Sequence, residues 1–258
     1  MTSHLLKFYP EAQFGGFSDV DGTVAFYSRI NSLLAPSSVV VDFGCGRGSG
    51  DSDSVPFRKH LRSFRGRVSQ VIGLDVDVAG SDNQFVDEFR LLTCGVAWPV
   101  QDETVDLLYS DFVLEHLPEP GFFFTEAYRV LKPGGYLCLR TPNALGYVGL
   151  ISVLLPGSLH KAILRQAQPD RRQADVFPTV YRCNTLWALR RELRTKGFKG
   201  VVYGYDAEPS YLGFSSVAYW LGTVYSKLAP PMLRSCLFAF AQKAGFGQDG
   251  AVAQNGVF

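Results

Sequence analysis

The chain has 258 residues, 47% of them hydrophobic, which is enough to bury the core of one large domain or of one domain with an elaborate cap. Its 25 Lys and Arg against 24 Asp and Glu give a formal net charge of +1, so bulk charge offers no reason to bind nucleic acid. The five cysteines form no C-x-x-C pair, which argues against a zinc site or a disulfide framework and favours reduced thiols in the cytoplasm. We expect neither a signal peptide nor a membrane-spanning helix.

The predicted elements alternate between helix and strand, which is typical of an α/β domain. In chain order we predict a helix at residues 21–34, a strand at 38–42, a helix at 56–64, strands at 68–75, 91–93 and 105–110, a helix at 120–131 and a strand at 136–140. The run Lys132-Pro133-Gly134-Gly135 is expected to end the helix at 120–131.

The alternation lapses after residue 142. Residues 143–183 are too long for a simple connection, so we predict a lid or acceptor-binding insertion there. A helix at 184–196 with Asn184 as its N-cap, a strand at 199–205, a helix at 211–228 and a strand at 237–242 follow. We therefore expect a single domain, 1–258, with a cofactor-binding core at about 20–142, the lid, a C-terminal part at 184–244 and a flexible tail at 245–258.

Residues 211–237 are rich in aromatic and apolar side chains. Packing against the sheet, the lid or a second subunit is the favoured interpretation, which leaves a homodimer open. Peripheral contact with a membrane is the less favoured alternative, because the stretch has no polar face rich in Lys and Arg.

The glycine-rich stretch VVVDFGCGRGSG, residues 39–50, carries the main functional signal. A buried parallel strand ends at Asp42, and the glycines at 44, 46 and 48 let a ligand approach the backbone closely. By itself this pattern fits either a dinucleotide or another nucleoside-bearing cofactor. Asp42 suits a cationic amino group better than a pyrophosphate, and Asp75, at the end of the second strand, can accept both hydroxyls of a ribose.

Four motifs in order resemble those of class I S-adenosylmethionine-dependent methyltransferases: VVVDFGCGRGSG, VIGLDVD, SDFVLEHLPEP and EAYRVLKPGGYLCLRTPN. They lie within residues 38–142, and the last two resemble the small-molecule branch called type 11. The resemblance implies a Rossmann-like, doubly wound, mostly parallel sheet whose last strand is antiparallel. It also implies S-adenosyl-L-methionine as cofactor, with S-adenosyl-L-homocysteine as product. An NAD(P)-dependent oxidoreductase is the competing interpretation, but Ser49 stands where the dinucleotide fingerprint needs its last glycine.

The resemblance also assigns roles to residues. Asp42 and the glycine loop would hold the methionine part of the cofactor, Asp75 the ribose, and Val76 or Asp77 the adenine. Ser110 would face the methyl group, with Phe112 nearby. The implied cofactor-binding residues are Asp42, Gly44, Cys45, Gly46, Gly48, Asp75, Val76, Asp77 and Ser110. The chain departs from the family pattern in a long polar stretch at residues 50–55 and in Cys94, which stands where an acid often holds the adenine amino group.

Methyl transfer from a sulfonium requires alignment and exclusion of water, and neither a metal nor a covalent nucleophile is predicted. A base, where the acceptor needs one, is expected in the lid region, and the candidates are His160, Asp175 and Tyr181. Arg182 would pair with an acidic group of the acceptor. Phe112 and His116 are the other acceptor-side candidates, and a structural role for His116 is the favoured alternative.

We expect O-methylation of a small-molecule or glycosidic acceptor, in the modification of a secondary metabolite or polysaccharide. N- or C-methylation on the same scaffold remains open, as does a catalytically silent cofactor-binding protein.

Overall fold

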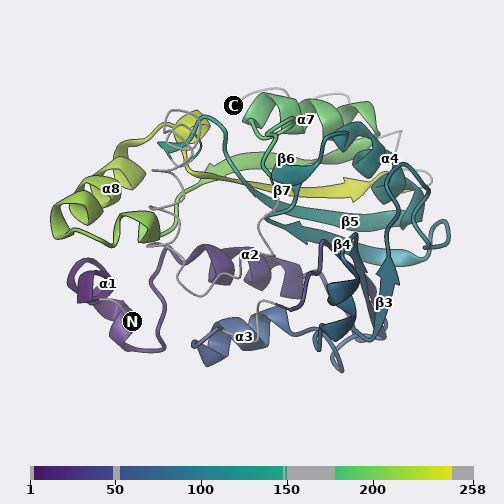
Figure 1. Cartoon of the computed structure of the whole chain (residues 1–258), viewed down its shortest axis with the longest axis horizontal. Helices are drawn as coiled ribbons and strands as arrows, with labels where there is room; N and C mark the ends of the chain where they lie inside the picture. The colour runs from purple at the N-terminus through teal and green to yellow at the C-terminus, as the bar shows by residue number, and fades with distance from the viewer. Residues whose placement is uncertain (1–2, 49–52, 148, 150–177, 246–258) are drawn as a thin grey trace.

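The computed structural model describes residues 3–48, 53–147, 149 and 178–245. A seven-stranded sheet in the order β3-β2-β1-β4-β5-β7-β6 forms its centre (Figure 1). The strands are β1 (Val39–Phe43), β2 (Gln70–Asp75), β3 (Glu88–Leu91), β4 (Val105–Asp111), β5 (Leu131–Pro142), β6 (Phe198–Tyr205) and β7 (Cys236–Lys243). β7 runs antiparallel to β5 and β6, and the neighbouring pairs from β3 to β5 are parallel. The predicted mostly parallel sheet with an antiparallel last strand is confirmed.

Helices cover both faces of this sheet (Figure 1). They are α1 (Ser3–Phe8), α2 (Gly22–Asn31), α3 (Pro56–Arg62), α4 (Pro120–Val130), α7 (Leu186–Thr195) and α8 (Ser216–Leu228). On one face, Phe26 of α2 and Leu61 of α3 pack against Val40 of β1 and Leu107 of β4. On the other face, α4 packs in one core with the alternate residues Val41 of β1 and Leu108 of β4, and α7 packs on β6 and β7. Because successive side chains of a strand point to opposite faces, the apolar residues 39–41 of β1 and 107–109 of β4 serve both layers.

The fifth strand differs from its prediction. β5 begins at Leu131, so Lys132-Pro133-Gly134-Gly135 lies within the strand instead of closing α4. Val105 pairs with Leu131 and Leu107 with Tyr136, and this shift of register absorbs the extra residues as a bulge. Gly134 has a φ of +81°, a conformation that glycine adopts without steric cost.

Two boundaries also differ. The third strand lies at 88–91 rather than 91–93, because its residues pair with Ile72–Asp75 of β2. Asn184 is not the N-cap of α7, since Thr185 accepts the hydrogen bond from the backbone N–H of Ala188. Asn184 is buried instead, and its side-chain amide donates to the Thr141 hydroxyl at 2.6 Å.

The aromatic stretch near the C-terminus packs against the N-terminal segment. Tyr219 of α8 is buried and stacks on Phe8 of α1, with their ring centroids 5.3 Å apart. Elsewhere on α8, Trp220 and Leu228 are 51% and 77% exposed. Within the described ranges, no helix combines the length and the hydropathy needed to cross a bilayer.

Candidate functional site

Several polar side chains gather at one edge of the sheet, where the parallel strands end; we call it the carboxyl edge. Asp42 lies near the end of β1, Asp75 is the last residue of β2, and Asp111 is the last residue of β4. The register confirms that they are neighbours, because Asp42 pairs with Gly73 of β2 and Tyr109 of β4. In doubly wound sheets, ligands bind outside this edge, where the strand order reverses, here between β1 and β4.

The glycine loop after β1 turns sharply over the end of β2. Gly44, Gly46 and Gly48 have φ values of +76°, +49° and +81°. The backbone N–H of Gly44 donates to the Leu74 carbonyl at 2.8 Å. A Cβ on Gly44 would lie 2.3 Å from Cγ2 of Val113, whereas a Cβ on Gly46 would meet nothing within 4 Å. Gly44 is therefore required by packing, and Gly46 borders open space in which a ligand can approach the backbone.

Asp75 ties this loop to the end of β2. One carboxylate oxygen accepts from the backbone N–H of Gly46 at 2.8 Å, and the other accepts from that of Asp77 at 2.9 Å. Each carboxylate oxygen can accept two hydrogen bonds, so both keep a lone pair for a further donor. The side chain is 9% exposed. This arrangement suits the two hydroxyls of a ribose beside the glycine loop.

Asn83 is a second support of the loop, and the sequence analysis missed it. Its side-chain amide donates to the Cys45 carbonyl at 2.9 Å, while its Oδ1 accepts from the backbone N–H of Phe85. A Cβ on Gly48 would lie 2.6 Å from that Oδ1, so the glycine and the asparagine fit together. Asn83 lies outside the four motifs, and only its position in the fold reveals the role.

Asp42 is a partly buried residue whose carboxyl has an unusual proton affinity. Burial raises its pKa to about 7, the hydrogen bond with Tyr109 acts in the opposite direction, and the negative charges of Asp111 and Asp75 raise it further. A cation next to Asp42 would replace the missing solvation and favour the ionised form. The cationic amino group of a methionine moiety has the charge that this position needs.

Asp111 has the opposite environment. The Nε and Nη2 atoms of Arg140 contact its two oxygens at 2.5 and 2.6 Å, and the Tyr27 hydroxyl donates to it at 3.0 Å. Burial alone would raise the pKa of Asp111, but the charge and hydrogen bonds of Arg140 outweigh burial and hold this pKa below its usual value. The Phe112 ring lies over the same guanidinium, 4.8 Å from its Cζ.

Phe112 itself has a left-handed backbone, with a φ of +57°, and its side chain is 41% exposed. Such a conformation is costly for a bulky residue and recurs at functional sites. The backbone N–H donates to the Arg140 carbonyl at 2.9 Å, which fixes the turn at the end of β4.

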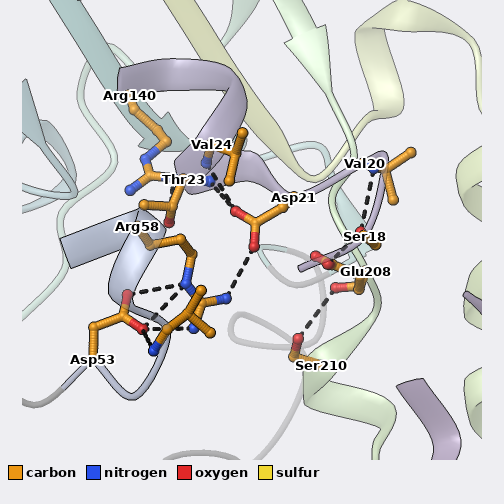
Figure 2. A network of polar contacts seen from close by, with 11 residues as sticks. Ser18, Val20, Asp21, Thr23, Val24, Asp53, Arg58, Arg140, Glu208 and Ser210 are labelled. Atoms are coloured by element: carbon orange, nitrogen blue, oxygen red, sulfur yellow. Dashed lines mark hydrogen bonds and ion pairs between the residues drawn. The ribbon is translucent and has the colours of Figure 1, made fainter. Parts of the chain in front are cut away.

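Ion pairs and hydrogen bonds attach the N-terminal segment to α3 and to the chain after β6 (Figure 2). Arg58 of α3 contacts Asp53 at 2.7 Å and Asp21 at 2.9 Å. Asp21 also caps α2, since it accepts from the backbone N–H groups of Thr23 and Val24. Ser18 donates to Glu208, which follows β6 (Figure 2).

The other predicted cofactor-binding residues differ in burial and in their contacts. Ser110 is fully buried and donates to the Phe43 carbonyl at 3.2 Å, so its hydroxyl joins β4 to β1, and a role toward the methyl group stays a prediction. Cys45 packs against Gly73. Val76 is half-exposed, and the side chain of Asp77 accepts from the backbone N–H of Ala79.

The acceptor-side candidates are only partly described. His116 lies in the short helix η4 (Leu114–His116), with Nδ1 3.0 Å from the Pro178 carbonyl oxygen. The carbonyl of Glu115 accepts from the backbone N–H groups of Val180 and Tyr181. These two hydrogen bonds attach residues 180–181 to η4. Arg182 and Cys94 are exposed. His160 and Asp175 lie outside the described residues.

Residues 41–139 match the family model described as "Methyltransferase domain". A probable S-adenosylmethionine-dependent methyltransferase from Mycolicibacterium smegmatis is 31% identical over 124 residues, which cover 47% of this chain and 44% of that protein. The chain carries a class I, S-adenosylmethionine-dependent methyltransferase domain. The arsenite methyltransferase of Halobacterium salinarum is 34% identical to this chain over 119 residues, covering 42% of the chain and 28% of the relative. The chain thus spans less than half the length of these two curated relatives.

The likeness in fold extends beyond the matched residues. Phosphoethanolamine N-methyltransferase 2 of Haemonchus contortus superposes with a TM-score of 0.53 at 16% identity, over 94% of this chain and 58% of that one. At this identity the likeness concerns the fold alone. The cofactor of the methyltransferase domain is S-adenosylmethionine. In the described part of the chain, no cluster of three or more His, Cys, Asp or Glu could hold a metal ion.

Proposed function

We propose that the chain is an S-adenosylmethionine-dependent methyltransferase that O-methylates a small-molecule or glycosidic acceptor by direct in-line transfer. The observation that carries the proposal is the pair of carboxyls beside the glycine loop. Asp75 presents free lone pairs next to the open backbone of Gly46. Burial of the Asp42 carboxyl raises its pKa to about 7, and the charge of Arg62 opposes this rise only in part. A cofactor with a ribose and a cationic amino group satisfies both.

When bound, the cofactor supplies a methyl group already activated by the positive sulfur. The protein then needs to orient the two reactants and exclude water. The glycine loop, Asp42 and Asp75 hold the donor, while Ser110 and Phe112 at the end of β4 border the methyl side in this proposal. Arg140 keeps Asp111 ionised and supports the Phe112 ring. In this proposal Arg140 and Asp111 are positioning residues, which hold Phe112 at the end of β4.

The acceptor of this chain is inferred, because the sequence relatives do not identify it. One relative is named for arsenite, which is chemically remote from a hydroxyl acceptor, so the relatives do not select the acceptor. His160, Asp175, Tyr181 and Arg182 remain the candidates for acceptor chemistry, and N- or C-methylation or a silent cofactor-binding protein remain the alternatives. The proposal includes a single domain, a small-molecule acceptor from secondary-metabolite or polysaccharide modification, and a cytoplasmic location, which the five unpaired cysteines support.

Titration calorimetry with S-adenosylhomocysteine tests the donor site. We expect binding to the wild-type chain and a loss of roughly tenfold or more in affinity for Asp75→Ala, because the variant loses a charge-assisted acceptor for both hydroxyls. Asp102→Asn is the matched control, since Asp102 is 72% exposed and lies near the opposite edge of the sheet. Absence of binding by the folded wild type would sink the proposal.

Transfer of a labelled methyl group tests the acceptor class. With a panel of hydroxyl, amine and carbon acceptors, we expect label on oxygen. Label on nitrogen or carbon would select that alternative. Binding of the cofactor without transfer to any acceptor would favour the silent cofactor-binding protein.

A further inference from the structure

A cavity of about 210 Å³ lies between the N-terminal segment, α8 and the chain after β6. Its walls include Phe8, Glu11, Asp19, Val20 and Asp206. Because β5 and β6 are both antiparallel to β7, they run parallel to each other, and Asp206 therefore follows the carboxyl end of β6. The cavity thus lies at the same edge of the sheet as the glycine loop. Its volume is below the roughly 300 Å³ typical of pockets for drug-sized ligands, so it suits a small ligand or one group of a larger ligand.

Asp206 has one satisfied and one unsatisfied oxygen. The side chain is only 8% exposed. Its Oδ1 accepts from the backbone N–H of Ser235 at 2.7 Å and from the Ser235 hydroxyl at 2.6 Å. Its Oδ2 is buried and has no hydrogen-bond partner among the residues that the structure describes. A buried carboxylate oxygen without a partner is costly. Because Asp206 also lines the cavity, a positive charge bound there would offset part of this cost.

Carboxylates also outnumber cations around the cavity. Glu11 and Asp19 line it together with Asp206, and Lys227 is the single cation among its described lining residues. Glu208 lies close by, since its negative charge contributes to the raised pKa of Tyr9 after the larger effect of burial. Arg58 of α3, whose charge acts on Glu208, is already engaged by two carboxylates (Figure 2). The local field therefore attracts positive charge.

The lining favours an organic cation over a metal ion. No group of three or more acidic, His or Cys side chains in the described ranges is close enough to share a metal, so these carboxylates do not converge on a point. Phe8 and Val20 provide apolar wall, which suits the carbon atoms of an alkylated amine. We propose that this cavity binds an organic ammonium group, carried either by the methyl acceptor or by a separate ligand. The proposal stands apart from the proposed function, because it needs no cofactor.

Calorimetry with choline and its neutral analogue 3,3-dimethylbutan-1-ol tests the site on the full chain without cofactor. We expect choline to bind about tenfold or more tightly than the neutral analogue. Asp19→Asn and Asp206→Asn should each weaken choline binding by roughly 3- to 10-fold, and Lys227→Gln should strengthen it, because each change alters the charge at the cavity. Asp102→Asn, on the far edge, should leave it unchanged.

Equal affinity for choline and the neutral analogue would overturn the proposal, and so would unchanged choline binding in both aspartate variants. Asp19 is exposed, so Asp19→Asn tests the effect of the negative charge even where Asp206→Asn fails to fold.

A second experiment supplies labelled S-adenosylmethionine with ethanolamine and choline. Transfer of label assigns the ammonium group to the acceptor, whereas choline binding without transfer assigns it to a separate ligand. Loss of S-adenosylhomocysteine binding would leave the choline titration intact, so the two proposals fail separately.

Discussion

Three aspartates at the carboxyl edge illustrate how their surroundings decide what a carboxyl group does. Asp111 is held ionised by Arg140, Asp75 accepts two backbone N–H groups, and burial of the Asp42 carboxyl raises its pKa to about 7. The sequence singled out Asp42 and Asp75 because they end apolar strands beside glycines. It gave no sign of Asp111, because its partner Arg140 becomes a neighbour only through the register of β4 and β5.

The raised pKa of Asp42 has a consequence for stability. The native state binds the proton more tightly than the unfolded chain, so this contribution is complete below about pH 4 and is lost as the pH rises through about 7. We expect the free energy of unfolding to fall over this window by on the order of 2–4 kcal/mol more in the wild type than in Asp42→Asn. Urea denaturation at pH 5 and pH 8 measures this difference. Because burial also raises the pKa of Glu208, the difference between the two proteins is the informative quantity, and identical pH slopes would contradict the assignment.

At the scale of the elements, the glycine loop combines two kinds of glycine. Gly44 must be small because Val113 fills the space where a Cβ would lie, whereas Gly46 borders open space. Gly48 is matched to the buried side chain of Asn83. The sequence pattern shows three glycines alike, and only the packing separates a structural position from one that a ligand can approach.

This separation predicts opposite behaviour for two alanine variants. Gly44→Ala should destabilise the fold by about 2 kcal/mol or more, since its Cβ would lie 2.3 Å from the Val113 side chain at a φ of +76°. Gly46→Ala should cost only about 1 kcal/mol, from its φ of +49°, but should weaken S-adenosylhomocysteine binding at least tenfold. Thermal denaturation and calorimetry on both variants measure the two effects. A stable Gly44→Ala variant, or undiminished cofactor affinity in Gly46→Ala, would refute this division.

At the scale of the whole molecule, Arg140 joins three elements. It leaves β5 to contact Asp111 of β4 and lies over the rings of Phe26 and Tyr27 in α2, while its Nη1 reaches the Thr23 hydroxyl at 3.3 Å. The N-terminal segment continues this contact through Asp21 and Ser18 toward α3 and the chain after β6. The helical layer on this face is therefore attached to the carboxyl edge by charges as well as by apolar packing.

Removing both partners of this buried pair should cost less than the sum of removing each one alone. We expect Arg140→Leu to cost about 3–5 kcal/mol, because Asp111 is left as a buried charge with weaker support from Arg62. The double variant Arg140→Leu with Asp111→Leu should be less destabilised than the sum of the single variants, by about 1 kcal/mol or more. Chemical denaturation of all four proteins gives the coupling energy. Strict additivity would show that the pair contributes no coupling to stability.

The local pattern of the sequence determined the order of strands and helices along the chain, because β-branched runs, glycines and prolines act within a few residues. It also predicts Asp42 and Asp75 as donor-side acids, since each ends a strand expected from the sequence. Only the tertiary structure decided that Lys132–Gly135 joins β5, that Thr185 and not Asn184 caps α7, and that Asn83 supports the glycine loop. These outcomes depend on partners far along the chain, as does the cavity at Asp206, whose walls come from residues near both ends of the described chain. Local propensity cannot encode such contacts, because the register of the sheet and the packing of α1 on α8 bring them together.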